Sequence, residues 1–258
     1  MARKPFIAGN WKMYKTTNEA VELAGGLVRE IGKFVHAGIA ICPTFTVLND
    51  VYKAVEDSVV SLGSQDVYWE SEGAYTGEIS PIMVKDTGCE YAIVGHSERR
   101  KYFSETDETV NKKAKAVLAI GLTPIVCIGE TLEEREQGKT MEVIKTQLEG
   151  SLSGFAAIDI LSSVIAYEPV WAIGTGKTAT PDQAEEVHSF IRKWLEEKYT
   201  NENSEKVRIL YGGSVKPENI RELMEKENID GALVGGAALK KDSFVSIVKN
   251  AVSDTIKQ

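Results

Sequence analysis

The stretch YAIVGHSERRKYFSETDETVNKKAKAVLAIGLTPIVCI, residues 91–128, decides the fold because it contains one complete structural repeat. Its two ends, Tyr91–Gly95 and Thr123–Ile128, are short apolar runs. Between them, apolar residues recur at the spacing of a helix face, and Gly121 follows as a helix stop. The pattern predicts a strand, a helix and a second strand. The predicted helix face consists of Val110, Ala114, Val117 and Leu118.

The same succession of apolar runs and helical segments continues along the whole chain. The runs show little alternation of apolar and polar residues, which is typical of parallel strands buried on both faces. The segments between them are long enough for the helical crossovers that parallel strands require. The predicted strands are Phe6–Gly9, Ala37–Cys42, Val59–Gln65, Tyr91–Gly95, Thr123–Ile128, Val164–Tyr167, Arg208–Tyr211 and Gly231–Val234.

Helix-start signals occur in phase with these strands. A Ser or Thr followed three residues later by an acidic residue or Gln has capping-box spacing, which satisfies two backbone N–H groups at a helix start. Proline is favoured at the first helical position because its missing N–H would have no partner there. The capping-box pairs are Thr16–Glu19, Ser104–Asp107, Thr131–Glu134 and Thr180–Gln183, and the prolines are Pro81, Pro181 and Pro217.

Eight strand–helix units without a linker or a shift in composition predict one domain over residues 1–258. A closed (β/α)8 barrel of the α/β class accommodates such units and leaves no sheet edge exposed. An open, doubly wound sheet is the main alternative. In both folds functional residues are expected after the carboxyl ends of the strands.

The composition excludes several classes of protein. With 43% hydrophobic and 26% charged residues, the chain is globular rather than disordered or fibrous. Its net charge of -8 argues against a general binder of nucleic acid or anionic membranes, so any anion must be held by a local cluster. Cys42, Cys89 and Cys127 form no CxxC motif, and no signal peptide or membrane span is evident. We expect a cytoplasmic protein with reduced thiols and no bound metal.

Two predicted strand ends carry donors suited to an oxyanion or a phosphate. Asn10 and Lys12 follow the first strand and supply a neutral donor and a positive charge. His96 follows the fourth strand and precedes a short helical segment that contains Glu98. A helix start disfavours imidazolium, so a neutral His96 that donates one hydrogen bond is predicted. The alternatives are a surface lysine and a histidine that only caps its own turn.

Glu168, after the sixth strand, is the candidate general base. It is the only ionised residue from Val164 through Thr175. Loss of solvation in apolar surroundings should raise its pKa toward a value suited to proton abstraction. In the alternative interpretation, Pro169 ends the strand and Glu168 points into solvent.

The segment from Gly174 to Pro181 resembles a nucleotide loop only weakly. A Walker A loop would need glycine at Trp171, and the GxGxx[GA] match of Gly174 to Ala179 is separated from its strand. This match leaves an NAD-dependent oxidoreductase as an alternative. A mobile lid with stiffer shoulders is the better interpretation. The shoulders are Pro169, Val170 and Trp171 on one side and Lys177, Thr178 and Ala179 on the other.

The last two strands both end in paired glycines. Gly212-Gly213-Ser214 follows the seventh strand and Gly235-Gly236 follows the eighth. Glycines allow backbone N–H groups to approach an anion, and barrels often bind phosphate after these two strands. The sequence therefore predicts a phosphate pocket, which is the local cluster that the acidic net charge requires.

Five motifs together resemble the triosephosphate isomerase family, in the family's order and over essentially the whole chain. They are Ala8-Gly-Asn-Trp-Lys-Met13, Gly95-His-Ser-Glu-Arg-Arg100, Ala166-Tyr-Glu-Pro-Val-Trp-Ala-Ile-Gly-Thr-Gly-Lys177, Tyr211-Gly-Gly-Ser214 and Val234-Gly-Gly236. The resemblance implies a TIM barrel that interconverts dihydroxyacetone phosphate and D-glyceraldehyde 3-phosphate through an enediol(ate), in glycolysis and gluconeogenesis. It implies no cofactor.

The resemblance also assigns roles to residues, because the mechanism of this family is known. Glu168 corresponds to the catalytic base, and His96 to the neutral electrophile that also moves protons between substrate oxygens. Lys12 and Asn10 correspond to oxyanion and substrate contacts, and Glu98 to a carboxylate beside the lysine. The phosphate-binding positions are Gly174, Ser214, Gly235 and Gly236.

The segment from Gln65 to Ser80 resembles the family's long interdigitating loop. This resemblance implies a homodimer in which Thr76 lies near the partner's active site. Besides the oxidoreductase, a non-catalytic phosphosugar-binding barrel remains an alternative to the isomerase.

Overall fold

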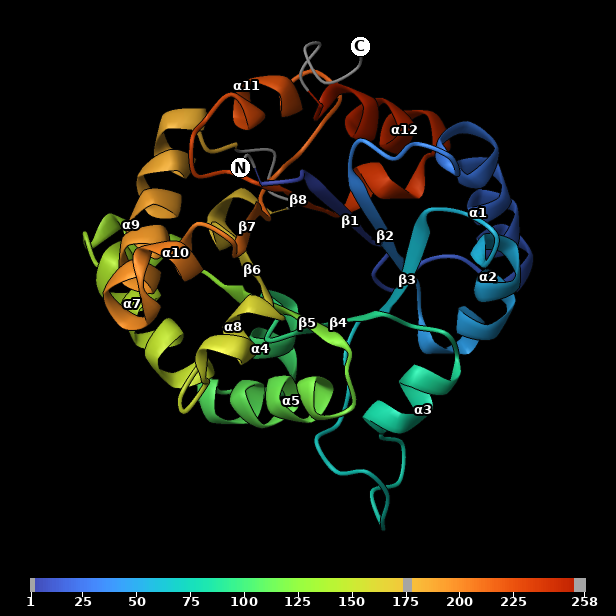
Figure 1. Cartoon of the computed structure of the whole chain (residues 1–258), viewed down its shortest axis with the longest axis horizontal. Helices are drawn as coiled ribbons and strands as arrows, with labels where there is room; N and C mark the ends of the chain where they lie inside the picture. Colours follow the sequence, from blue (N-terminus) through green and yellow to red (C-terminus); the bar gives the residue numbers. More distant parts are fainter. Residues whose placement is uncertain (1–2, 174–177, 253–258) are drawn as a thin grey trace.

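The computed structural model describes residues 3–173 and 178–252. Within these residues, eight parallel strands form a closed ring in chain order, in which β1 pairs with both β2 and β8. Figure 1 looks down this ring, with the helices arranged around it. The strands are β1 (Phe6–Asn10), β2 (Gly38–Cys42), β3 (Val60–Ser64), β4 (Tyr91–Val94), β5 (Thr123–Ile128), β6 (Val164–Tyr167), β7 (Arg208–Tyr211) and β8 (Gly231–Val234).

The closed ring confirms the (β/α)8 barrel and shows that the open, doubly wound alternative is wrong. Phe6 of β1 lies opposite Gly38 of β2 on one side and Gly231 of β8 on the other, so no strand forms an edge. The predicted bounds of β5 to β8 are confirmed. Those of β1, β2 and β4 differ by one residue at one end, and those of β3 by one residue at each end. The apolar strand pattern was sufficient because both faces of the ring are buried.

Helices form the outer layer, and short 3₁₀ turns follow β2, β6 and β8. The longer helices are α1 (Thr17–Ile31), α2 (Leu48–Val55), α5 (Asp107–Ala119), α7 (Thr140–Ser151), α9 (Pro181–Tyr199) and α12 (Lys241–Asn250). The shorter helices are α3 (Pro81–Asp86), α4 (Ser97–Phe103), α6 (Leu132–Glu136), α8 (Ala157–Leu161), α10 (Asn201–Ser204) and α11 (Ile220–Met224). The 3₁₀ turns are η1 (Phe45–Val47), η2 (Val170–Ala172) and η3 (Gly236–Leu239). Among the described residues, no helix combines the length and hydropathy that a bilayer span requires.

Most of the predicted helix starts are confirmed. Thr16, Thr131 and Thr180 are the N-caps of α1, α6 and α9, each with a capping box. Pro81 and Pro181 occupy the first positions of α3 and α9.

Two predicted helix starts are wrong. Ser104 ends α4 with a φ of 55°, and α5 is instead capped by Thr106, whose hydroxyl accepts from the N–H of Thr109. Ser104 in this left-handed conformation reverses the chain between the two helices, so it cannot supply the extended backbone of an N-cap. Pro217 lies in a turn before α11, which begins at Ile220.

The hydrophobic core has two parts, one inside the ring and one between the ring and the helices. Side chains alternate between them along each strand, so Phe6 and Ala8 point inward while Ile7 packs under the helices. The inner part contains Phe6, Ala8, Ala40, Cys42, Ile93, Ile125, Cys127, Val164, Ala166, Leu210 and Leu233.

The inward-pointing side chains at every second strand residue continue past the strand ends, and this places the candidate site. Asn10 follows Ala8 by two residues, and Glu168 follows Ala166 by two. Both side chains are therefore directed to the carboxyl-terminal mouth of the ring.

The capping arrangement gives a direct test of the corrected helix start. We expect Thr106→Ala to lower the free energy of unfolding by about 1 kcal/mol, because it removes an N-cap acceptor. Ser104→Ala removes no cap bond, so we expect a change within about 0.5 kcal/mol. Urea unfolding followed by circular dichroism measures both, and equal losses would contradict the assignment of Thr106 as the cap.

Candidate active site

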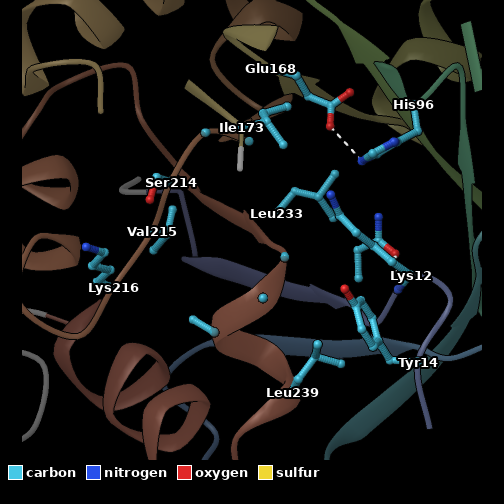
Figure 2. Close-up of a pocket in the computed structure, with 16 residues that line it drawn as sticks. Lys12, Tyr14, His96, Glu168, Ile173, Ser214, Val215, Lys216, Leu233 and Leu239 are labelled. Carbon is cyan, nitrogen blue, oxygen red and sulfur yellow. Dashed lines mark hydrogen bonds and ion pairs between the residues drawn. The ribbon is translucent and has the colours of Figure 1, made fainter. Parts of the chain in front are cut away.

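A cavity of about 380 Å³ opens at the carboxyl ends of the strands. Figure 2 shows the residues that line it, which lie at or just after the ends of β1, β4, β6, β7 and β8. Of the predicted site residues, Asn10, Lys12, His96, Glu168, Ser214, Gly235 and Gly236 line this cavity. Gly174 lies outside the described residues, and Thr76 is exposed on a loop elsewhere.

Glu168 and His96 are in direct contact at the wall of the cavity (Figure 2). Nε2 of His96 lies 2.9 Å from Oε1 of Glu168, and Oε2 of Glu168 accepts the backbone N–H of Ser97 at 2.9 Å. The two side chains are almost fully buried, with 5% of His96 and 2% of Glu168 exposed. Glu168 therefore faces the site, and the interpretation that it points into solvent is wrong.

His96 is also the N-cap of α4, so the capping interpretation and the functional one describe the same ring. Its Nδ1 accepts the backbone N–H of Glu98 at 3.2 Å. A nitrogen that accepts this bond carries no proton, so the contact fits a ring with its proton on Nε2, facing Glu168. Burial lowers the pKa of His96, but the carboxylates of Glu168 and Glu98 raise it above its ordinary value. Gly95 makes the turn into the helix possible, because its φ is 72° and a β-carbon there would lie 2.8 Å from Cγ2 of Val110.

The predicted upward shift of the Glu168 pKa is wrong for this arrangement. Burial does raise the pKa of the carboxyl group, but the His96 ring and the N–H of Ser97 stabilise the carboxylate more strongly. The pKa of Glu168 is therefore below its ordinary value of 4.5. The apolar surroundings were visible in the sequence, whereas these hydrogen bonds were not.

Lys12 is held in an uncommon backbone conformation beside the cavity. Its φ is 52°, a left-handed value that costs a non-glycine residue about 1 kcal/mol or more. Its N–H donates to Oδ1 of Asn10 at 3.0 Å, and its carbonyl accepts from Nε2 of Gln65 at 2.8 Å. These bonds fix the direction of the side chain.

The ammonium group of Lys12 lies between two other parts of the site. It forms an ion pair with the carboxylate of Glu98, so these two residues lie side by side as expected. A β-carbon built on Gly235 would lie 3.9 Å from Nζ of Lys12, so the charge also borders the predicted phosphate pocket.

The glycines after β8 leave open space for a ligand. A β-carbon on Gly236 would meet no atom within 4 Å, and one on Gly235 would meet only Lys12. Ser214 and the Gly212-Gly213 pair also line the cavity. Glycine backbone and a hydroxyl group around an open volume are suited to an anion such as phosphate.

Several cavity residues were not predicted from the sequence. Leu233 and Ile173 supply apolar walls, and Tyr14, Lys216 and Leu239 lie toward the rim. Only Leu233 had a usable signal, because it lies near the end of a predicted strand, two residues before Gly235, and points into the ring.

The described shoulder of the predicted lid is attached to Glu130. Nε1 of Trp171 and the hydroxyl of Tyr167 donate to Oε1 of Glu130 at 2.9 and 3.1 Å, and the N–H of Val170 donates to its carbonyl at 3.1 Å. Pro169 precedes these residues and leads into η2. Of the other shoulder, Thr178 is exposed and Ala179 buried, while Lys177 lies outside the described residues.

The described residues contain no group of three His, Cys, Asp or Glu side chains that could hold a metal ion.

A buried carboxylate, an imidazole N–H, an ammonium group and an open anion pocket meet in this cavity. This combination is suited to removing a proton next to a carbonyl group and to stabilising the oxyanion that forms. The fold and the site thus define a (β/α)8-barrel enzyme that transfers protons on a small phosphorylated substrate.

Comparisons with known proteins identify the family. A family model described as triosephosphate isomerase matches residues 5–251. The triosephosphate isomerase of Geobacter metallireducens is 57% identical over 246 residues, which cover 95% of this chain and 98% of that protein. That of Carboxydothermus hydrogenoformans is 55% identical over 250 residues, which cover 97% of this chain and 100% of that protein.

A solved structure agrees with these sequence matches. The crystal structure of triosephosphate isomerase from Bartonella henselae superposes with a TM-score of 0.86 at 40% identity, and the match covers 96% of this chain and 98% of the other. The chain belongs to the triosephosphate isomerase family. This result confirms the resemblance found in the sequence.

The contact between His96 and Glu168 predicts a measurable change in pKa. His96→Asn keeps an N-cap acceptor but withdraws the ring from the carboxylate. We expect the pKa of Glu168 to rise, because burial still raises it while the lowering effect of His96 is lost. A ¹³C NMR titration of the ligand-free protein with labelled glutamate measures this pKa. His36→Asn, at the other end of the barrel, is the control, and an unchanged pKa in His96→Asn would contradict the proposed contact.

Proposed function

We propose that this protein interconverts dihydroxyacetone phosphate and D-glyceraldehyde 3-phosphate without a cofactor, with Glu168 as the base. The contact of Glu168 with His96 at the cavity wall, in a chain of this family, is the observation that carries the proposal. The whole chain, residues 1–258, acts as one catalytic domain in this proposal.

The base must leave its partners before it can act. In the ligand-free arrangement, Glu168 is held by His96 and by the N–H of Ser97. A substrate that draws the carboxylate into the cavity breaks these hydrogen bonds while burial persists, and its pKa then rises. The carboxylate becomes a stronger base when it reaches the proton on the substrate carbon. General-base catalysis of this kind typically contributes about 10²–10⁴-fold.

The same movement frees the Nε2–H of His96 for the substrate. The N–H can then donate to the carbonyl oxygen, and the ring can exchange protons between the two substrate oxygens. Lys12 supplies positive charge to the oxyanion, and Asn10 supplies a neutral donor beside it. One donor to an oxyanion is worth about 10²–10³-fold, so the base and its electrophilic partners act together.

The phosphate group of the substrate is held at the opposite side of the cavity. Ser214, Gly235 and Gly236 line this part of the cavity next to Lys12. The family resemblance adds Gly174, which lies outside the described residues, as a further phosphate contact. Closure of the lid over the substrate excludes water and protects the enediol(ate) from loss of phosphate.

The dinucleotide alternative has no support in the described structure. A dinucleotide loop makes a tight turn directly after its strand. Here β6 ends at Tyr167, and η2 (Val170–Ala172) intervenes before Gly174. The non-catalytic phosphosugar-binding alternative makes a different experimental prediction from the isomerase.

Glu168→Gln tests the role of the base. We expect kcat for isomerisation to fall by at least about 10²–10⁴-fold, because the amide cannot accept the proton. A coupled assay with D-glyceraldehyde 3-phosphate measures turnover, and calorimetry with inorganic phosphate measures ligand binding, which should persist. The exposed residue Glu186, changed to Gln, is the matched control. Near-normal turnover of Glu168→Gln would refute the role, and absence of turnover in the unmodified protein would favour the non-catalytic alternative.

We also propose a homodimer formed through the loop between β3 and α3, residues 65–80. This loop projects away from the barrel in Figure 1, and Thr76 and Tyr75 on it are exposed. The base of the loop is firmly attached, because Gln65 donates to the carbonyls of Lys12 and Cys42 at 2.8 and 2.9 Å. A rigid projection of this kind fits a complementary surface on a second copy.

Exposed apolar side chains near the site provide such a surface. Met13 is 90% exposed, and Tyr102 and Phe103 of α4 are 66% and 65% exposed. Because Met13 and α4 directly follow Lys12 and His96, a partner loop that covers them would place Thr76 near the catalytic groups. The dimer would thus support the activity.

Thr76→Arg tests the dimer. We expect a shift from dimer to monomer in sedimentation equilibrium and a lower kcat/KM, because a charged side chain is costly in a packed interface. Thr146→Arg on the exposed face of α7 is the control. A Thr76→Arg protein that stays dimeric with normal kcat/KM would contradict this role of the loop.

We propose a cytoplasmic location. Cys42, Cys89 and Cys127 are unpaired and buried, which suits a reducing compartment. The acidic net charge of -8 further indicates that nucleic acid and anionic membranes are not partners.

A further inference from the structure

The side chain of Gln147 makes two hydrogen bonds to a single backbone residue, Gly129. Its Oε1 accepts the N–H of Gly129 at 2.7 Å, and its Nε2 donates to the carbonyl of Gly129 at 3.1 Å. Gln147 belongs to α7, on the outside of the barrel, whereas Gly129 directly follows β5. The amide thus binds the end of β5 much as a neighbouring strand would, and it fixes both the position and the orientation of this peptide.

Gly129 in turn lies against the main chain of Glu168. A β-carbon built on Gly129 would lie 1.7 Å from the carbonyl oxygen of Glu168 and 3.2 Å from its Cα. The residue before it, Ile128, accepts the N–H of Glu168 at 2.7 Å. A displacement of Gly129 is therefore transmitted to the backbone that carries the Glu168 carboxylate.

The carboxylate has room to be misplaced. A second cavity, of about 300 Å³, also borders Glu168. Glu168, Ser97, Val170, Gly129 and Gln147 are among its lining residues. Because this space is not filled by side chains, packing alone does not determine where the carboxylate lies. Its position depends on the hydrogen bonds to His96 and Ser97 and on the anchoring of the backbone that carries it.

We propose that Gln147 is a positioning residue for the isomerisation, which acts on Glu168 through Gly129. The inference rests on the proposed function of Glu168 as the base. Gln147 touches neither the substrate cavity nor the phosphate pocket. Its loss should therefore change proton transfer much more than substrate binding.

Gln147→Leu removes both hydrogen bonds at similar volume and is the first test. We expect kcat to fall by about 10- to 100-fold, since a displacement of about 1 Å at the reacting group can cost about 10²-fold. KM for D-glyceraldehyde 3-phosphate and the inhibition constant of inorganic phosphate should change less than about threefold, because the phosphate pocket is untouched. Gln137→Leu, which removes an exposed glutamine at the end of α6, is the matched control.

A double-mutant cycle distinguishes positioning from general destabilisation. In a Glu168→Gln background there is no base to position, so adding Gln147→Leu should lower the residual kcat by less than about twofold. If Gln147→Leu lowered kcat by the same factor in both backgrounds, or left kcat of the otherwise unmodified protein unchanged, the proposal would be overturned. Gln147→Glu is the second variant. It keeps the acceptor for the Gly129 N–H but loses the donor, so its kcat should lie between those of the unmodified protein and Gln147→Leu.

A measurement that does not depend on turnover separates this inference from the proposed function. The Nε2 proton of His96 faces Glu168, so its NMR signal in ¹⁵N-histidine-labelled protein reports the position of the carboxylate. Gln147→Leu should shift this signal and Gln137→Leu should not. Absence of turnover in the unmodified protein would refute the proposed function alone, whereas an unchanged His96 signal in Gln147→Leu would refute the positioning role.

Discussion

The two-residue period of the strands within a closed ring is the constraint on which the site depends. Inside the ring, Phe6 and Ala8 are packed among other apolar side chains, and their series continues to Asn10. On β6 the series through Ala166 continues to Glu168. A shift of one residue in either strand would direct these polar side chains under the helices, where a buried carboxylate without partners is costly. The packing that stabilises the barrel therefore also directs the reactive groups.

The buried carboxylate of Glu168 and the ammonium group of Lys12 both have partners in the described structure. Glu168 is held by His96 and by the N–H of Ser97, while Lys12 is paired with Glu98. Such pairing offsets the cost of burying charge, and a substrate must replace these partners to engage the same groups. With Lys12 paired and a net charge of -8, glycine backbone and the Ser214 hydroxyl are suited to share in holding a phosphate.

Local patterns predicted the elements well where a local cause determines them. The strand Thr123–Ile128 is apolar on both faces because both faces are buried, and its bounds were predicted without error. The helix after Ser104 was predicted to begin too early, because the left-handed turn at Ser104 reverses the chain before Thr106 caps α5. The Ser-x-x-Asp pattern was present, but the backbone conformation that a cap requires was not.

The sequence by itself determined the barrel, the family and the types of residue that follow each strand, because hydrophobic period and motif order are properties of the chain. Only the tertiary structure decided the state of those residues. The N–H of Ser97 reaches Glu168 across 71 residues of sequence and, together with His96, lowers its pKa where burial alone would raise it. The bonds from Gln147 to Gly129 span 18 residues and leave no periodic signature. Such contacts depend on distances that exist only once the ring has closed.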